Sequence, residues 1–149
     1  MPWPKKLKKI PAVKEVMTPF PYSIEGRETL DRAREMMAEH KIHHLPVIDQ
    51  GILLGVISNR DLLRTLDQSE QNGEDPPRVA DVPREDAYVV DLSAPLDRVL
   101  FRMAEERLGA ALVVKDDRLA GIFTLSDACR YFAEYLRQQF PSSGGDEAA

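Results

Sequence analysis

This chain has little of what marks secreted, membrane-spanning or nucleic-acid-binding proteins. Its single cysteine, Cys129, cannot form an internal disulfide, so a reducing cytoplasm is the expected location. No apolar run approaches the ~20 residues that cross a bilayer. The four lysines at 5–9 are not followed by the apolar segment of a secretory signal, and are expected to lie on a solvated terminus. A net charge of −5 argues against a nucleic-acid partner.

The sequence also lacks recognisable catalytic machinery. No nucleophile–base motif, acid–base pair or metal-ligand motif is present, so we predict no enzyme and no catalytic residue. His40, His43 and His44 lie close together but have no cysteine near them. We expect histidines that face solvent or line a cleft, and no metal site. Cys129 is expected to be a small buried apolar group rather than a nucleophile.

What the chain does contain is an internal repeat. The stretch GVISNRD at 55–61 returns as GIFTLSD at 121–127, and because Gly55 is repeated as Gly121, the offset is 66 residues. The same offset holds without a gap back to Val13 and Val79, and it pairs LDR at 30–32 with LDR at 96–98. Self-similarity at a fixed period is stronger evidence of architecture than any single motif.

Each copy is predicted to form a β-α-β-β-α unit. In the first copy, apolar positions at helical spacing predict a helix from Leu30 to about His40, after a short extended piece at 22–24. Two short apolar runs joined by Gln50-Gly51 predict a hairpin, and the same pattern surrounds residues 116–117. A second helix follows each hairpin. Helices alternating with short strands indicate a mixed α/β (α+β) sandwich.

The boundaries of the units follow from composition. We expect a basic N-terminal segment at 1–12, a first repeat at 13–66, an acidic linker at 67–78, a second repeat at 79–140 and a disordered tail at 141–149. The last helix carries an apolar stripe, Ala128, Phe132, Leu136 and Phe140. Core packing would explain this stripe, but so would an interface with another chain.

Ser58-x-x-Asp61 and Thr124-x-x-Asp127 fit two interpretations. A hydroxyl and a carboxylate three residues apart form a capping box at a helix N-terminus. A strand that leads directly into a helix also presents amides and the positive end of the helix dipole to an anion. The aspartate can then accept hydrogen bonds from two ribose hydroxyls. The two roles are compatible.

These motifs, together with KIHHLPVID at 41–49 and VKEVMT at 13–18, resemble the CBS domain family. The span from about Val13 to Leu136 is similar to a stand-alone CBS pair, or Bateman module. The second copy departs from the pattern, because it lacks a proline matching Pro46 and has Pro83-Arg84 where the first copy has Met17-Thr18. The resemblance implies two repeats packed through their sheets with pseudo-two-fold symmetry, and a homodimer.

The resemblance also implies two clefts for adenosine-containing ligands, chiefly AMP, ADP, ATP or S-adenosylmethionine, with an aspartate from one copy on the ribose. The first cleft would use Ser58, Asn59, Arg60 and Asp61, with Val90, Gly109, Ala110 and Ala111 around the base. The second cleft would use Thr124, Ser126 and Asp127, with Ile24, His43, His44, Leu45 and Pro46.

The two clefts are predicted to be unequal. Arg60 offers a planar fork of donors to a phosphate, whereas the equivalent position in the second copy is Ser126. In the second cleft a phosphate would have to meet Lys41, His43 or His44 instead. We therefore expect the Asp61 cleft to hold phosphate better than the Asp127 cleft.

Two functions are compatible with this sequence. The first is a sensor module that binds an adenosine nucleotide and signals to an unknown effector protein by a change of conformation. The second is a ligand-free interaction module that keeps only the fold, in which case the capping boxes explain both aspartates completely.

Overall fold

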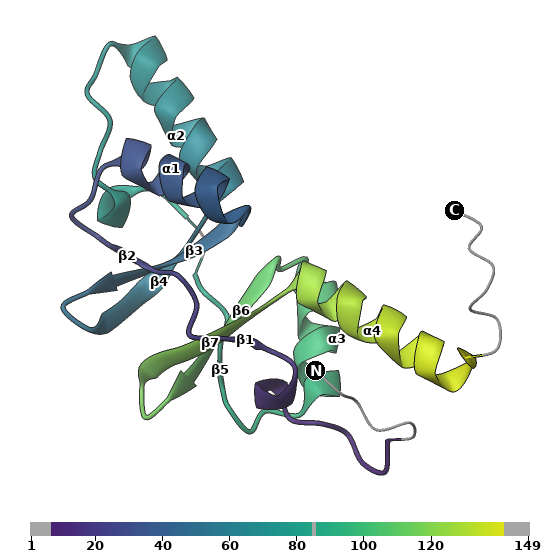
Figure 1. The fold of residues 1–149 in the computed structure, drawn as a ribbon. Coiled ribbons are helices and arrows are strands. Elements are labelled where there is room, and N and C mark those ends of the chain that lie inside the picture. Colours follow the sequence, from purple (N-terminus) through teal and green to yellow (C-terminus); the bar gives the residue numbers. More distant parts are fainter. Residues whose placement is uncertain (1–6, 85, 142–149) are drawn as a thin grey trace.

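The computed structural model describes residues 7–84 and 86–141. Within them the chain forms two mixed α/β units side by side (Figure 1). The tail predicted at 141–149, apart from its first residue, and the first two lysines of the N-terminal cluster lie outside the described residues. No helix in this part of the chain is long and apolar enough to cross a membrane.

The first repeat forms the predicted elements. They are β2 (Ile24–Glu25), α1 (Leu30–His40), β3 (His44–Asp49), β4 (Ile52–Ser58) and α2 (Asn59–Asn72). The strand expected at 22–24 lies slightly later in the chain, at β2. The predicted hairpin joins β3 to β4, and its turn residues Gln50 and Gly51 have φ of 51° and 84°. Positive φ at both positions matches the right-handed twist of the two strands.

The second repeat follows the same order. Its elements are β5 (Val89–Asp91), α3 (Leu96–Glu106), β6 (Ala110–Lys115), β7 (Arg118–Thr124) and α4 (Leu125–Gln139). The turn at Asp116 and Asp117 again has positive φ, 52° and 64°. Even the register irregularity in β3 after Val47 returns in β6 after Val113, at the same 66-residue offset.

The N-terminal segment of each repeat packs against the other repeat. The amide of Val13 donates to the carbonyl of Ala94 at 2.8 Å, and the amide of Val79 donates to the carbonyl of Glu28 at 3.0 Å. The two donors, Val13 and Val79, are separated by the repeat offset, and so are the two acceptors, Glu28 and Ala94. Each bond is therefore the equivalent of the other under the repeat. Reciprocal contacts of this kind are the mark of a two-fold axis.

Each opening segment is consequently buried in the core of the other repeat. Val13 and Val16 pack with Leu96, Val99 and Met103 of the second repeat. In the same way Val79 and Val82 pack with the α1 residues Leu30, Ala33 and Met37. The sequence boundaries at 13 and 79 therefore do not separate the two packed units, because neither core is complete without a segment of the other repeat.

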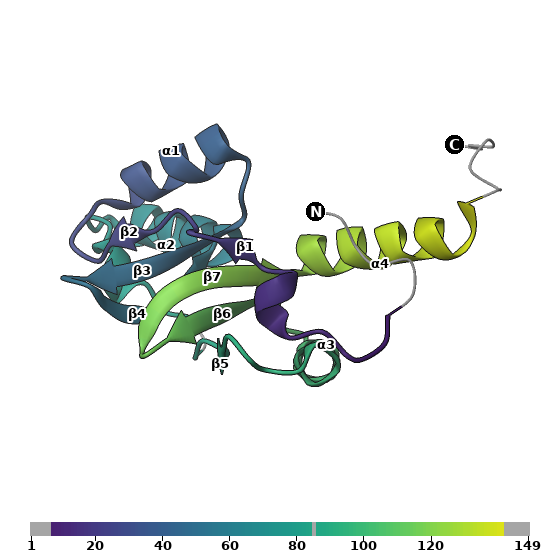
Figure 2. The ribbon, with the colours of Figure 1, turned by 60° about the horizontal axis from the view of Figure 1, so that its bottom comes forward.

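The two sheets pack against each other, with α1 and α2 on the outer side of one sheet and α3 on the outer side of the other (Figures 1 and 2). One sheet has the order β2-β3-β4, and the other has the order β1-β7-β6-β5, in which β1 is Thr18–Pro19 of the first repeat. Leu53 and Val56 of β4 pack against an apolar cluster of Ala110, Leu112 and Ile122. This packing holds the start of α2 close to the second repeat.

The linker is shorter than predicted. Residues 67–72 belong to α2, which ends at Gly73 with a φ of 66°. The segment 67–72 contains no glycine or proline, and it buries Ser69 on the helix face that also buries Thr65. The linker begins only at Gly73, where the left-handed conformation stops the helix.

Helix α4 differs from the other three long helices, because it has no buried residue. The expectation that Cys129 is buried is therefore wrong, since this residue is exposed on α4. Ala128 packs at the edge of the second core, but Phe132 is 59% exposed and Leu136 is 40% exposed. The helix extends away from the body of the protein in Figure 2. Core packing therefore does not explain the stripe that the sequence predicts.

Candidate functional site

A cleft of about 930 Å3 lies between the N-terminus of α2 and the second repeat. Both repeats supply its walls. From the first repeat it is lined by His43, His44, Val56, Ser58, Asn59, Arg60, Asp61, Leu63, Arg64 and Asp67. From the second it is lined by Asp86, Ala87, Tyr88, Arg107, Leu108, Gly109, Ala110 and Leu125. A ligand here would contact both copies at once.

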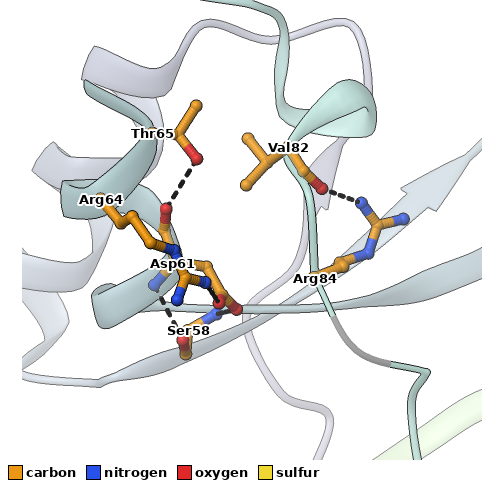
Figure 3. Close-up of polar contacts among 6 residues, drawn as sticks. All are labelled: Ser58, Asp61, Arg64, Thr65, Val82 and Arg84. Carbon is orange, nitrogen blue, oxygen red and sulfur yellow. Dashed lines mark hydrogen bonds and ion pairs between the residues drawn. The ribbon is translucent and has the colours of Figure 1, made fainter. Parts of the chain in front are cut away.

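Asp61 lines this cleft, and a capping box holds its carboxylate in place (Figure 3). The hydroxyl of Ser58 accepts from the Asp61 amide at 3.1 Å, and Oδ2 of Asp61 accepts from the Ser58 amide at 3.2 Å. Oδ1 accepts from Arg64 at 2.6 Å, but the Arg64 side chain is 52% exposed. Exposed ion pairs contribute little free energy, so a ligand can compete for this oxygen.

Asp127 occupies the equivalent place at the start of α4 and has more partners. Oδ2 accepts from the amide of Thr124 at 2.9 Å and from its hydroxyl at 3.1 Å. Oδ1 accepts from the hydroxyl of Thr18 at 3.1 Å and from Arg130 at 3.4 Å. Thr18 comes from the first repeat, where strand β1 pairs with β7.

The histidines lie in two different environments. His43 and His44 line the cleft, and the carbonyl of His43 accepts from the amide of Asn59 at 2.8 Å. Burial lowers the pKa of His44, and His43 lowers it further, while the Asp61 carboxylate acts in the opposite direction. His40 instead stacks on Tyr22, with 3.6 Å between the ring centroids. Among the residues described, no three His, Cys, Asp or Glu side chains converge as metal ligands would.

Several predicted site residues come together as proposed for the Asp61 cleft. Ser58, Asn59, Arg60 and Asp61 line it from one side, and Gly109 and Ala110 line it from the other. His43 and His44, which the sequence places with Asp127, also line this cleft. They adjoin the start of α2 because β3 pairs with the end of β4, where His44 faces Ser58.

Other predicted residues do not reach the cleft with their side chains. Ala111, Ile24 and Leu45 are buried in the cores of the repeats, and Pro46 is buried in β3. Val90 packs on the second core from β5. The residues of this segment that line the cleft are instead Ala87 and Tyr88, just before β5.

Thr124 and Asp127 are at the N-terminus of α4, as predicted, with Ser126 exposed in its first turn. Leu125, the first residue of α4, lines the Asp61 cleft. The amide of Leu125 donates to the carbonyl of Gly109, just as the amide of Asn59 donates to that of His43. The two helix starts therefore lie near each other, in equivalent settings.

Sequence reasoning missed Arg107 as a cleft residue. Arg107 ends α3 in the left-handed conformation, with a φ of 55°, and Lys41 ends α1 in the same way with a φ of 56°. Neither the Arg60 nor the Arg107 side chain makes a hydrogen bond or ion pair with the residues that the structure describes. Arg107 is equivalent to Lys41 under the repeat offset, and the sequence places Lys41 near a phosphate. This equivalence could have identified Arg107.

Comparison with known protein families extends this description. A sequence model of the CBS domain matches the chain twice, at residues 13–68 and 79–134. The CBS domain-containing protein YhcV of Bacillus subtilis is 28% identical over 117 residues, which cover 78% of this chain and 81% of that protein. L-aspartate semialdehyde sulfurtransferase of Methanocaldococcus jannaschii is 26% identical over 125 residues, which cover 83% of this chain but only 23% of that enzyme.

Two similar solved structures hold adenosine compounds. CBSX2 in complex with AMP has a TM-score of 0.74 at 28% identity, covering 85% of this chain and 99% of that chain. The CBS domain pair of protein MJ0100, in complex with 5′-methylthioadenosine and S-adenosylmethionine, has a TM-score of 0.75 at 25% identity. It covers 85% of this chain and 98% of that chain. The similarity therefore extends over both repeats.

Proposed function

This chain belongs to the CBS domain family, and we propose that it is a regulatory module that binds an adenosine nucleotide between its two repeats. The observation that carries the proposal is Asp61, a carboxylate fixed by a capping box beside a cleft lined by both repeats. CBS pairs are generally regulatory, and we assign no catalytic step to the cleft.

The lining of the cleft suggests how the nucleotide would lie. The carboxylate of Asp61 would accept hydrogen bonds from the ribose hydroxyls. The adenine would pack between Val56 of the first repeat and Ala87 and Leu108 of the second, where the wall is apolar. Arg60 would then donate to the phosphates, which leave the ribose toward the N-terminus of α2.

The solved relatives support an adenosine compound as the ligand. CBSX2 holds AMP, and the MJ0100 domain pair holds 5′-methylthioadenosine and S-adenosylmethionine. For this chain we favour a phosphorylated nucleotide such as AMP, ADP or ATP over S-adenosylmethionine. The reason is that Arg60 and Arg107 both line the cleft, and their guanidinium groups have no partner among the described residues.

Binding would be transmitted by a change in the relative position of the two repeats. The cleft is built from both repeats, so a ligand that contacts both walls favours one arrangement over others. We propose that an effector protein recognises this arrangement of the two repeats. The ligand can shift the equilibrium only by its difference in affinity for the two arrangements.

We propose a homodimer formed through α4. An amphipathic helix gains most of its stability from packing of its apolar face, and α4 buries no residue within its own chain. A second copy related by a two-fold axis would place the same stripe, centred on Phe132 and Leu136, against itself.

Isothermal titration calorimetry with AMP, ATP and S-adenosylmethionine tests the nucleotide site. Asp61→Asn keeps a side-chain carbonyl that can cap α2, but it removes the charge that accepts from the ribose. We expect this variant to bind AMP about 10- to 100-fold more weakly, as for a hydrogen bond to a charged group.

Asp67→Asn is the matched control, because Asp67 also lines the cleft but lies six residues further along α2. It should keep the wild-type affinity for AMP. If the wild-type chain binds none of the three compounds below millimolar concentration, a ligand-free interaction module becomes the better description.

A further inference from the structure

We infer that each chain binds one nucleotide, in the Asp61 cleft, and that Thr18 closes the equivalent position beside Asp127. This inference rests on the proposed nucleotide function, which it extends to stoichiometry and to the residue that decides it. Its basis is a difference between two carboxylates that the repeat makes equivalent.

The carboxylate of Asp127 is saturated by the chain itself. An ionised carboxylate has about four acceptor positions on its two oxygens. Those of Asp127 are taken by the amide and hydroxyl of Thr124, by the hydroxyl of Thr18 and by Arg130. A ribose diol brings two donors. It could replace Arg130, whose side chain is 63% exposed and only 3.4 Å from the carboxylate, but it would also have to displace the hydroxyl of Thr18.

The carboxylate of Asp61 is engaged only in part. Within residues 7–84 and 86–141 it accepts two side-chain hydrogen bonds, from the Ser58 amide and from Arg64. Two acceptor positions remain for the two hydroxyl donors of a ribose. Asp61 also lies in the cleft of about 930 Å3, so these positions are accessible to a ligand.

Two donors to Asp127 have no counterpart at Asp61, the hydroxyls of Thr124 and Thr18, and of these only Thr18 comes from the other repeat. Arg64 and Arg130 are equivalent under the repeat offset, and each pairs with its own aspartate. Position 18 in the first repeat corresponds to position 84 in the second, where the residue is Arg84.

Thr18 donates a hydrogen bond to Asp127, but Arg84 donates none to Asp61. The Arg84 guanidinium donates to the carbonyls of Ala80 and Val82 at 3.2 and 3.1 Å, and it lies against Gly55 of β4. Figure 3 shows Arg84 directed away from Asp61, toward Val82. Thr18, by contrast, is held over its aspartate because β1 pairs with β7. The hydroxyl of Thr18 therefore takes the place that a ribose hydroxyl would need.

The test is the stoichiometry of AMP and ATP binding to the full chain, by calorimetry, in four variants. Comparing the AMP affinities of Asp61→Asn and Asp127→Asn shows which carboxylate binds the ribose. Thr18→Val nearly preserves the shape of the side chain but removes its hydroxyl donor. Thr18→Ser is the control, because serine keeps a hydroxyl donor. Thr18 is exposed, so the valine variant should fold normally. Thermal unfolding confirms this for each protein.

We expect one nucleotide per wild-type chain, about 10- to 100-fold weaker binding in Asp61→Asn, and unchanged affinity in Asp127→Asn. Thr18→Val should bind a second nucleotide, and Thr18→Ser should bind only one. Two equal binding events in the wild-type chain, or a single event in Thr18→Val, would overturn the inference and leave the nucleotide function standing. Absence of any binding would overturn the nucleotide function and this inference with it.

Discussion

The imidazole of His44 lies directly against Gly109, so that a methyl group at position 109 would approach Nε2 within 2.6 Å. The contact joins the two repeats across the Asp61 cleft, because His44 is in β3 and Gly109 precedes β6. His44 can occupy this position because Gly109, in the other repeat, has no side chain.

Gly109→Ala should therefore weaken nucleotide binding by displacing His44 into the cleft. A separation below 3 Å is too short for a carbon–nitrogen contact, so either the ring or the backbone of 109 has to move. The φ of Gly109 does not lie in the left-handed region, so alanine adds no backbone strain. We expect a loss of AMP affinity of about tenfold, measured by calorimetry.

The double variant Gly109→Ala with His44→Ala is the control for this prediction. If the imidazole causes the effect, removing it should restore part of the affinity, and the two substitutions will not be additive. Strict additivity would show that the alanine acts through some other contact.

The stability of the protein should decrease at acidic pH in part through His44. Its pKa in the folded chain is below the ordinary value of 6.5 because the ring is buried, so the unfolded chain takes up a proton first as the pH falls. The free energy of unfolding therefore decreases below about pH 6.5, until the folded chain is also protonated. His44→Gln should show a smaller fall in Tm between about pH 7.5 and pH 5. Parallel pH profiles for the two proteins would exclude this role.

The two capping boxes should contribute similarly to stability. Ser58 and Thr124 both accept a hydrogen bond from the amide of the aspartate three residues later, at 3.1 and 3.2 Å. Ser58→Ala and Thr124→Ala should each lower the free energy of unfolding by about 1 kcal/mol, measured by urea denaturation. Only Ser58→Ala should also weaken AMP binding, because it loosens the start of α2 beside the cleft. A loss of AMP binding in Thr124→Ala alone would contradict this assignment.

Arg107 should distinguish phosphorylated ligands from unphosphorylated ones. Arg107→Gln is expected to lower the affinity for ATP by about tenfold and to leave the affinity for adenosine unchanged, because only the phosphates carry negative charge. Arg118→Gln, which removes the same charge at the exposed start of β7, is the control. Equal losses for ATP and adenosine would mean that Arg107 supports the shape of the cleft and does not bind phosphate.

Charges on the exposed face of α4 should abolish the proposed dimer. Phe132→Glu and Leu136→Glu would place carboxylates in an apolar interface, where their desolvation is costly. Light scattering should then change from twice 16.8 kDa to 16.8 kDa. Ile52→Glu puts the same charge on an exposed apolar residue of the β3–β4 hairpin and should remain dimeric. A wild-type monomer at high concentration would refute this interface.

Much of the fold was predictable because its signals are local. Helices α1 and α3 follow from apolar spacing, and the hairpin turns follow from Gln50-Gly51 and Asp116-Asp117. The capping boxes at Ser58 and Thr124 were predictable for the same reason. The end of α2 was missed, because acidic residues before Gly73 are compatible with both a linker and a helix.

The amino-acid sequence alone shows that one unit is used twice at an offset of 66 residues, and that each copy has a Ser/Thr-x-x-Asp motif at the predicted start of a helix. The segments that complete each copy are known only from the folded chain, because Val13 and Val79 are buried in the opposite repeats. The difference between the two aspartates also depends on the folded chain. Thr18 reaches Asp127 across 109 residues of chain, and such a contact depends on strand pairing between repeats, which no local pattern encodes.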